Sequence, residues 1–349
     1  MMADSSHPDL ARYVRQSRFA PLGEEGQRRL LSSRALVCGC GALGSVIANT
    51  LVRAGVGHVR LVDRDFLELN NLQRQVLFDE DDLRADLPKA IAAANKLRRI
   101  NSQVEIEPLV VDVDYQNIES LCDGVDCIVD GTDNFETRFL LNDAAVKLGI
   151  PWVYGGCLGA EGQTMTILPG ETACFRCVTA EPPDAGTAPT CDTAGILAPI
   201  IGVIASIEAN EALKILSGNR AAAQRNLLVI DLWENQIRQV RLDKMRDTAD
   251  CLTCRHGEYP WLSGKRGSHT AVLCGRNAVQ LTPPVRQQLS LATLAQKLAG
   301  VGRVTQNAFL LRLAVDDYVL TIFPDGRTIV GGTDDIATAR TVHARYIGA

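Results

Sequence analysis

The sequence predicts an α/β protein: a Rossmann-like mixed sheet with helices on both faces, followed by a small α+β domain. Three observations support this fold class. An apolar run over 35–38 leads into a glycine-rich turn and a helical stretch that reaches about residue 54. A second apolar run over 59–62 follows, and parallel strands joined by a helix begin an α/β sheet. Beyond residue 156 the pattern changes to hairpins, which makes the predicted sheet mixed.

The first predicted domain, residues 1–265, continues this alternation. A short helix over 24–31 precedes the first strand. Further helices are expected over 89–99, 135–148 and 195–216, and further strands over 104–111, 127–129, 152–154, 163–168, 227–231 and 237–242. A loop rich in proline, alanine and threonine over 181–189 precedes the last helix.

The second predicted domain, residues 266–349, follows a polar segment that contains glycine. A single core stops growing at about 250–300 residues, so a chain of 349 residues divides into two units. The order within the second unit is a strand over 278–281, a helix over 291–298, three strands up to residue 330 and a helix over 336–346. Asp325 and Gly326 supply a hairpin turn, and the whole suggests a β-grasp-like or TBP-like module.

Composition excludes several classes of function. The chain is 46% hydrophobic and 22% charged, which is typical of a folded domain and argues against disorder. Its net charge of -5 gives no general attraction to nucleic acid or to an anionic membrane. Its first residues are polar, without the apolar region of a signal peptide, and no uncharged stretch reaches the length of a membrane span. We therefore expect a cytoplasmic protein that binds neither nucleic acid nor membrane.

The glycine turn and the carboxylate after the second strand predict a nucleotide site. Gly39, Gly41 and Gly44 form a Gly-x-Gly-x-x-Gly turn that brings backbone N–H groups and a helix N-terminus close to a phosphate. Asp63 ends the next strand, where a carboxylate accepts hydrogen bonds from ribose hydroxyls, and Asp65 is a further polar candidate. The turn alone does not separate NAD from ATP, and it is also compatible with simple helix packing.

Amide and guanidinium groups come directly after this acidic pair. The run 71–75 contains Asn71 and Arg74, and Arg74 has the planar donors that clamp phosphate oxygens. Arg15 near the N-terminus and Lys89 at a helix start are further cationic candidates. Each is individually more often a surface charge than a ligand, but together they favour a triphosphate over a nicotinamide cofactor.

Two distant cysteine pairs predict a metal site. Cys174 with Cys177, and Cys251 with Cys254, have the spacing of a tetrahedral thiolate site, and four thiolates leave no open position for a substrate. The interpretation is therefore a structural Zn²⁺. A pair of redox dithiols is the alternative. His256 is expected to be a bystander.

These motifs, in this order, resemble the ubiquitin-activating-enzyme-like adenylyltransferases of the ThiF/MoeB/HesA family. The resemblance covers residues 12–254 and rests on RYVRQSRF, GCGALGS, DRDFLELNNLQRQ, Lys89, GTDN at 131–134, CFRC, PTCDTAGILAPIIG and CLTC. It implies ATP-dependent adenylylation of the C-terminal carboxylate of a ubiquitin-like sulfur-carrier protein, with release of pyrophosphate. It also implies a homodimer.

The resemblance assigns roles to individual residues. The ATP site would be lined by the following residues: Gly39, Gly41, Gly44, Asp63, Asp65, Asn71, Arg74, Lys89, Asp133 and Asn134. Arg15 would reach the partner subunit's nucleotide as an arginine finger, and Asp133 would help to hold Mg²⁺. The alternative for Asp133, with Glu136 three residues later, is a capping box at a helix start.

Cys191 and the second domain leave alternatives open. Cys191 lies between the proline-rich loop and a helix start, which lowers a thiol pKa, and the matching cysteine of some family members bonds covalently to the carrier's C-terminus. A spare thiol is the alternative for Cys191. The second domain, whose Cys274 lacks a sulfurtransferase loop, is expected to dock the carrier. The competing functions are conjugation or natural-product synthesis through Cys191, an NAD-dependent oxidoreductase, and a non-catalytic binder of ubiquitin-like proteins.

Overall fold

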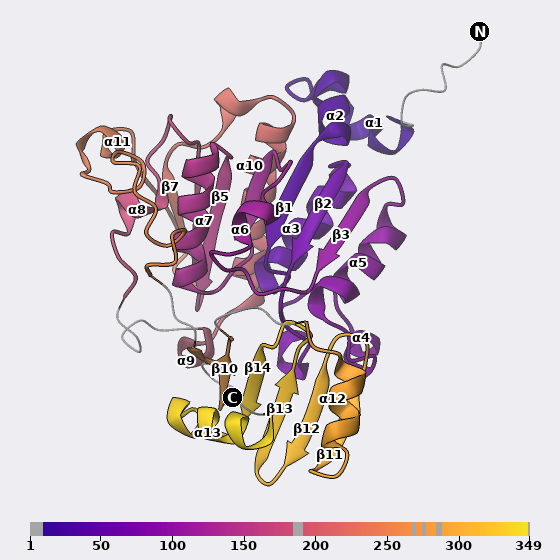
Figure 1. The fold of residues 1–349 in the computed structure, drawn as a ribbon. Helices are drawn as coiled ribbons and strands as arrows, with labels where there is room; N and C mark the ends of the chain where they lie inside the picture. Colours follow the sequence, from indigo (N-terminus) through magenta and orange to yellow (C-terminus); the bar gives the residue numbers. More distant parts are fainter. Residues whose placement is uncertain (1–9, 184–190, 267–269, 274–276, 284–287, 348–349) are drawn as a thin grey trace. The chain divides into compact units, whose positions relative to one another are not determined.

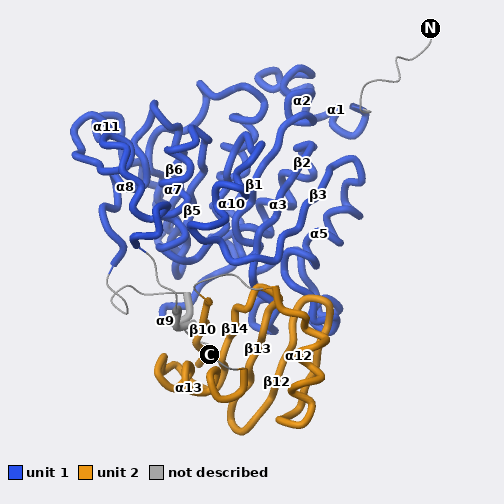
Figure 2. The backbone as a smooth tube through the Cα atoms, in the orientation of Figure 1, with its two compact units in different colours: residues 1–266 blue, residues 267–349 orange. Residues whose placement is uncertain are grey.

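The computed structural model describes residues 10–183, 191–266, 270–273, 277–283 and 288–347. The chain divides into two compact units, residues 1–266 and 267–349 (Figure 2). Within the described part of the chain, no helix combines the length and the apolar character needed to cross a membrane.

Unit 1 is built on an eight-stranded mixed sheet with the order β3-β2-β1-β4-β5-β6-β7-β8 (Figure 1). The first five strands of this order, from β3 to β5, run parallel to one another. Strands β6, β7 and β8 extend the sheet beyond β5, and each is antiparallel to the strand before it. The strands are β1 Arg34–Cys38, β2 His58–Val62, β3 Glu105–Leu109, β4 Cys127–Asp130, β5 Trp152–Leu158, β6 Glu161–Ile167, β7 Leu227–Asp231 and β8 Gln236–Val240. The prediction of a Rossmann-like mixed sheet is thus confirmed.

Helices cover both faces of this sheet. They are α1 Val14–Ser17, α2 Gly23–Ser32, α3 Ala42–Ala54, α4 Glu80–Arg84, α5 Lys89–Ile100, α6 Ile118–Leu121, α7 Phe135–Leu148, α8 Phe175–Val178, α9 Cys191–Ala194, α10 Ala198–Leu216 and α11 Met245–Thr248. Short 3-10 helices are η1 Leu10–Tyr13, η2 Leu69–Asn71 and η3 Arg220–Ala222.

Two hydrophobic clusters lie on opposite faces of the sheet because side chains alternate along each strand. Val37 of β1 belongs to the cluster formed with α3, α5 and α10, whereas Leu36 faces α7 in the second cluster. Both side chains are fully buried. This two-sided burial explains why β1 reads as a continuous apolar run.

One expectation for unit 1 needs correction. The long helix starts at Ala198 and not at Gly195, because Gly195 has a left-handed backbone with φ of +76° that ends the short α9. The polar segment in which the domain boundary was expected contains the division between the two units, after Arg266. Within it, Trp261 is buried and stacks on Phe139 at a centroid distance of 5.4 Å, so this side chain packs in the core of unit 1.

Unit 2 is a six-stranded antiparallel sheet with the order β11-β12-β13-β14-β10-β9. Its strands are β9 Thr270–Leu273, β10 Ala278–Leu281, β11 Arg303–Gln306, β12 Leu311–Val315, β13 Tyr318–Ile322 and β14 Thr328–Gly331, with helices α12 Leu291–Leu298 and α13 Ile336–Tyr346. Four strands lie between α12 and residue 331, and not the three expected. Edge strand β11 is mostly exposed and therefore has little apolar pattern.

Candidate nucleotide site and metal centre

The glycine turn packs directly against the segment that follows β4. Gly39 has a φ of +92°, which a glycine adopts without strain. A Cβ on Gly131 would lie 2.5 Å from the carbonyl oxygen of Gly39, and one on Gly44 would overlap the same oxygen. The backbones of the turn, α3 and the β4–α7 loop therefore meet without intervening side chains.

Gly41 keeps the approach to the N-terminus of α3 open. It is the N-cap of this 13-residue helix. A Cβ built on Gly41 would meet only the side-chain amide of Gln75, at 3.9 Å. Free backbone N–H groups and the helix dipole favour an anion at such a terminus, so a phosphate fits here.

Asp63 is fixed at the carboxyl end of β2 by two backbone groups. Its carboxylate accepts hydrogen bonds from the N–H of Cys40 and the N–H of Asp65, both at 2.7 Å. Burial raises the pKa of Asp63, while the nearby Lys89 acts in the opposite direction. A carboxylate has about four acceptor positions, so two remain for hydroxyl groups of a ribose.

Lys89 and Asp65 form a pair beside this carboxylate. The Lys89 Nζ lies 3.4 Å from the Asp65 carboxylate, and the Lys89 N–H donates to the Asp65 carbonyl at 2.8 Å. Lys89 is only 4% exposed, at the first position of α5. The structure therefore places Asp65 as the partner of Lys89, and both lie next to Asp63.

The 71–75 run forms η2 and the turn after it. Asn71 is buried, and its side chain accepts from the Glu68 N–H at 3.1 Å and donates to the Asn70 carboxamide at 2.9 Å. Arg74 is partly buried and donates to the Asn70 carbonyl at 2.8 Å. Asn71 thus holds the turn from which Arg74 projects.

Gln75 is a candidate site residue that the sequence analysis did not select. Its side chain is 3% exposed and lies beside Gly41. Its Oε1 has no hydrogen-bond partner among the described residues, and an unpaired buried acceptor is rare. Its position in the 71–75 run was the available signal, but the sequence does not show which of these side chains turns inward.

Asp133 and Asn134 divide the roles expected at the start of α7. The N-cap is Asn134, whose side chain accepts from the Thr137 N–H at 2.8 Å. The capping box expected for Asp133 and Glu136 is therefore wrong, because the chain enters the helix one residue later. Asp133 is exposed, beside the glycine turn through Gly131.

Arg15 lies near the opposite end of α3 from the glycine turn. It is an exposed residue of α1. The adjacent Gln16 donates its amide to the carbonyl of Ala54, the last residue of α3, at 2.9 Å. The 13 residues of α3 separate its ends by about 20 Å. Arg15 is therefore remote from the glycine turn of its own chain.

The four predicted metal ligands come together in unit 1. Their Sγ atoms all lie within 4.8 Å of one another. Three of the separations are 3.8 Å for Cys174 to Cys177, 3.5 Å for Cys174 to Cys251 and 3.4 Å for Cys177 to Cys254. A zinc tetrathiolate with bonds of about 2.3 Å has sulfur separations of about 3.8 Å, so the cluster fits this metal.

Polar contacts hold the second cysteine pair to α7. The carboxylate of Asp143 accepts from the Thr253 hydroxyl at 3.0 Å and from the Trp261 N–H at 2.9 Å. His256 is engaged with Asp250 at 2.6 Å, outside the four-cysteine cluster. The metal centre would therefore cross-link the chain after β8 to the body of the sheet.

The remaining cysteines fall into two groups. Five cysteines pack in or beside the sheet: Cys38, Cys40, Cys122 and Cys127 are buried, and Cys157 is half-buried. Burial raises the pKa of Cys122 to about 12. Cys191 is the first residue of α9, but its side chain, like the loop before it and Cys274, lies outside the described residues.

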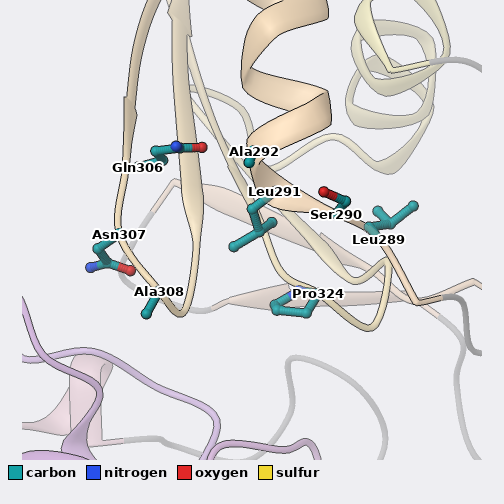
Figure 3. Close-up of a pocket in the computed structure, with 8 residues that line it drawn as sticks. All are labelled: Leu289, Ser290, Leu291, Ala292, Gln306, Asn307, Ala308 and Pro324. Carbon is teal, nitrogen blue, oxygen red and sulfur yellow. The ribbon is translucent and has the colours of Figure 1, made fainter.

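Unit 2 contains a pocket of about 430 Å³ at the start of α12. Figure 3 shows its lining, which comes from residues 289–292, residues 306–308 and Pro324. None of these side chains is charged. The residues suited to a triphosphate therefore lie in unit 1.

Comparisons with known proteins agree with this geometry. The chain matches the ThiF family model over residues 13–254. The sulfur carrier protein ThiS adenylyltransferase of Bacillus subtilis is 44% identical over 338 residues, which cover 97% of this chain and 99% of that protein. The SAMP-activating enzyme E1 of Haloferax volcanii is 40% identical over 248 residues, covering 71% of this chain and 90% of that protein.

A solved structure has the same fold. A crystal structure of E. coli MccB with succinimide matches with a TM-score of 0.60 at 21% identity, covering 71% of this chain and 74% of that one. The family match spans most of unit 1, including the glycine turn, Asp133 and all four cysteines. The chain belongs to the ThiF family.

Proposed function

We propose that this chain is an ATP-dependent adenylyltransferase that activates the C-terminal glycine carboxylate of a ubiquitin-like sulfur-carrier protein and releases pyrophosphate. Family membership and the names of the relatives from Bacillus subtilis and Haloferax volcanii support this activity. The match to the ThiS adenylyltransferase extends through unit 2, which favours a carrier of the ThiS type.

One structural observation carries the proposal: the glycine turn, Asp63, Lys89 and the segment with Asp133 converge at the carboxyl ends of β1, β2 and β4. Open α/β sheets bind ligands at this edge. Asp63 would hold the ribose, and the N-terminus of α3 the phosphates. Gln75 would donate from its side-chain amide nitrogen, which lies beside Gly41, to a phosphate oxygen.

The chemistry follows from the charges of these groups. The carrier carboxylate attacks the α-phosphate, the bond to pyrophosphate breaks and an acyl-adenylate forms. Negative charge on the phosphates is stabilised by positioned cations. Arg74 and Lys89 supply positive charge, and Asn71 orients Arg74. Mg²⁺ prefers carboxylate and phosphate oxygens, so the exposed Asp133 would share it with ATP.

The position of Arg15 favours a homodimer. Arg15 and the glycine turn of one chain lie at opposite ends of α3, about 20 Å apart. An arginine side chain does not span that distance. Arg15 would therefore act on the nucleotide of the partner subunit, as the family resemblance implies.

The metal centre and Cys191 have separate roles in this proposal. Zn²⁺ bound by Cys174, Cys177, Cys251 and Cys254 would be structural, because four thiolates fill its coordination. Unit 2 would dock the carrier. Cys191 would form a covalent bond with the carrier's activated C-terminus only if the acyl-adenylate is not the final product. A Cys191→Ser variant that retains full adenylation and sulfur transfer would remove that role.

Carrier-dependent exchange between ATP and labelled pyrophosphate tests the proposal. We expect exchange in the native protein, and loss of exchange with retained fold and zinc in Arg74→Ala and Arg15→Ala. Arg225→Ala, which removes a surface arginine paired with Glu171, is the control. Mixing the two inactive variants forms dimers with one intact site, so activity should return. Near-normal exchange in both single variants would contradict the assignment.

A further inference from the structure

Strands β4 and β5 diverge beside the candidate nucleotide site. Their ladder contains the pairs Ile128↔Trp152 and Val129↔Val153. Strand β4 then ends at Asp130, while β5 continues to Leu158 along β6. Backbone groups at the divergence have no β4–β5 ladder bonds and need other partners, because buried polar groups are almost always paired.

Arg138, in the second turn of α7, occupies this divergence. Its Nη2 donates to the Thr132 carbonyl at 2.7 Å and to the Gly155 carbonyl at 3.1 Å, and its Nε donates to the Asp130 carboxylate at 3.3 Å. Its side chain is 10% exposed. One guanidinium thus connects the end of β4, the loop after it and the neighbouring strand.

The loop with Asp133 is held from the other side as well. The buried carboxylate of Asp130 accepts from the N–H of Thr132 at 2.9 Å and from its hydroxyl at 2.7 Å. Gly131 packs on the carbonyl of Gly39. The residue before Asp133 is therefore fixed by a carboxylate, a guanidinium and the glycine turn.

We propose that Arg138 is a positioning residue for nucleotide binding, which bridges the divergence of β4 and β5 and thereby holds Asp133 toward the phosphates. It acts through Asp133 and does not itself contact the nucleotide. This inference rests on the proposed function of the site. The same guanidinium also holds β5 through the Gly155 carbonyl. Loss of Arg138 would therefore loosen residues 131–134 and residues 155–158 together.

An arginine is suited to this place because three acceptors surround it in different directions. A planar guanidinium offers five donors in a fixed geometry, whereas a lysine offers a single point of charge. Burial opposes the charged form, but Asp130 and Asp133 contribute to raising the pKa of Arg138, so its charge persists. Arg138→Lys would keep the charge and lose the bridge.

A double-mutant cycle on Mg·ATP affinity tests the role of Arg138. We expect Arg138→Lys to weaken Mg·ATP binding by on the order of tenfold, since hydrogen bonds from a charged group are lost. Asp133→Ala should also weaken binding. In the Asp133→Ala background, Arg138→Lys should have less than about a twofold further effect, because residues that act through one another are not additive. Equal effects in both backgrounds would overturn the proposal, as would unchanged affinity in Arg138→Lys.

Arg60 provides a matched control. Its side chain is 13% exposed and donates to one carboxylate and two backbone carbonyls: Glu107 at 2.7 Å, Leu121 at 2.6 Å and Asp123 at 3.2 Å. The two carbonyls belong to residues that precede β4 in the chain, and they are not part of the nucleotide site. Arg60→Lys should therefore leave Mg·ATP affinity within about twofold in either background.

Hydrogen exchange separates this inference from the proposed function. Without any nucleotide, Arg138→Lys should accelerate amide exchange in peptides covering 130–137 and 155–159, while Arg60→Lys should not. This result stands even if the native protein binds no ATP. Should Arg138→Lys fail to fold, the native protein decides: slow exchange of Thr132 in the absence of nucleotide is expected, and rapid exchange there would contradict a held loop.

Discussion

The buried carboxyl group of Glu208 should make the stability of the protein depend on pH. This residue of α10 is completely buried, with its carboxyl group packed on Gly155 of β5. Both carboxylate oxygens have no hydrogen-bond partner among the described residues. Burial raises the pKa of Glu208 well above its usual range, Asp130 acts in the same direction, and Arg138 acts in the opposite one. The raised pKa favours the protonated form of Glu208 in the folded protein, whereas the carboxyl group of an unfolded glutamate is ionised at neutral pH.

The sign of the pH dependence follows from this difference. An unfolded glutamate titrates at about pH 4.3, so above that pH the folded state binds one proton more than the unfolded state. The contribution to stability is complete below the unfolded pKa and is lost as pH rises toward the folded pKa, by about 1.4 kcal/mol per pH unit. The neutral isostere in Glu208→Gln has no such loss. Between pH 6 and pH 8 the variant should gain stability relative to the native protein, with an upper limit of about 2.7 kcal/mol for a carboxyl group that stays protonated over the whole range.

Urea unfolding at pH 6, 7 and 8, with zinc and ionic strength held constant, measures this difference. Glu161→Gln is the control, because the Glu161 side chain is 54% exposed and should give a pH profile parallel to that of the native protein. A constant difference between Glu208→Gln and the native protein at all three pH values would refute the reasoning. It would mean that Glu208 is ionised in the fold.

Three further predictions concern the glycine turn, the N-cap of α7 and the metal centre. Gly44→Ala places a Cβ on a backbone carbonyl of the glycine turn. It should lower the free energy of unfolding in urea by about 1–3 kcal/mol and abolish ATP binding, and unchanged binding would contradict this packing. Asn134→Ala removes the N-cap of α7 and should lower the free energy of unfolding by about 1 kcal/mol, whereas Asp133→Ala should leave it unchanged. A larger loss in Asp133→Ala than in Asn134→Ala would indicate that Asp133 is the cap. Metal analysis should find about one zinc per chain in the native protein and in Cys157→Ser but none in Cys251→Ser, and retained zinc there would exclude the four-thiolate centre.

Much of unit 1 could be predicted from the sequence because its elements carry strong local signals. The helix over 135–148 has the predicted bounds, and the strands beside the glycine turn differ from the prediction by one or two residues. Strand β9 was not anticipated, and three strands were expected after α12 where the structure has four. Among those four, edge strand β11 is mostly exposed and has little apolar pattern. Local periodicity thus places elements that face a core and misses those that do not.

The candidate site was predictable in its residue types but not in its contacts. Asp133 and Asn134 both suit a helix start, and only the backbone path decides that Asn134 is the cap. Trp261 belongs to a segment that is polar in sequence, yet its backbone N–H donates to the carboxylate of Asp143, which lies 118 positions earlier. Arg138 belongs to none of the motifs, and the motif that contains Gln75 does not show which way its side chain turns. Their roles come from tertiary contacts that no local pattern encodes.

The central claim is tested most directly by incubating the purified protein with Mg·ATP and a ThiS-type carrier that ends in Gly-Gly, followed by mass spectrometry of the intact carrier. We expect a carrier heavier by one adenylyl group, formed together with pyrophosphate. Formation should require the free C-terminal carboxylate and should be lost in Arg74→Ala. An unmodified carrier, across a panel of ubiquitin-like sulfur carriers and with zinc-loaded, folded protein, would contradict the account.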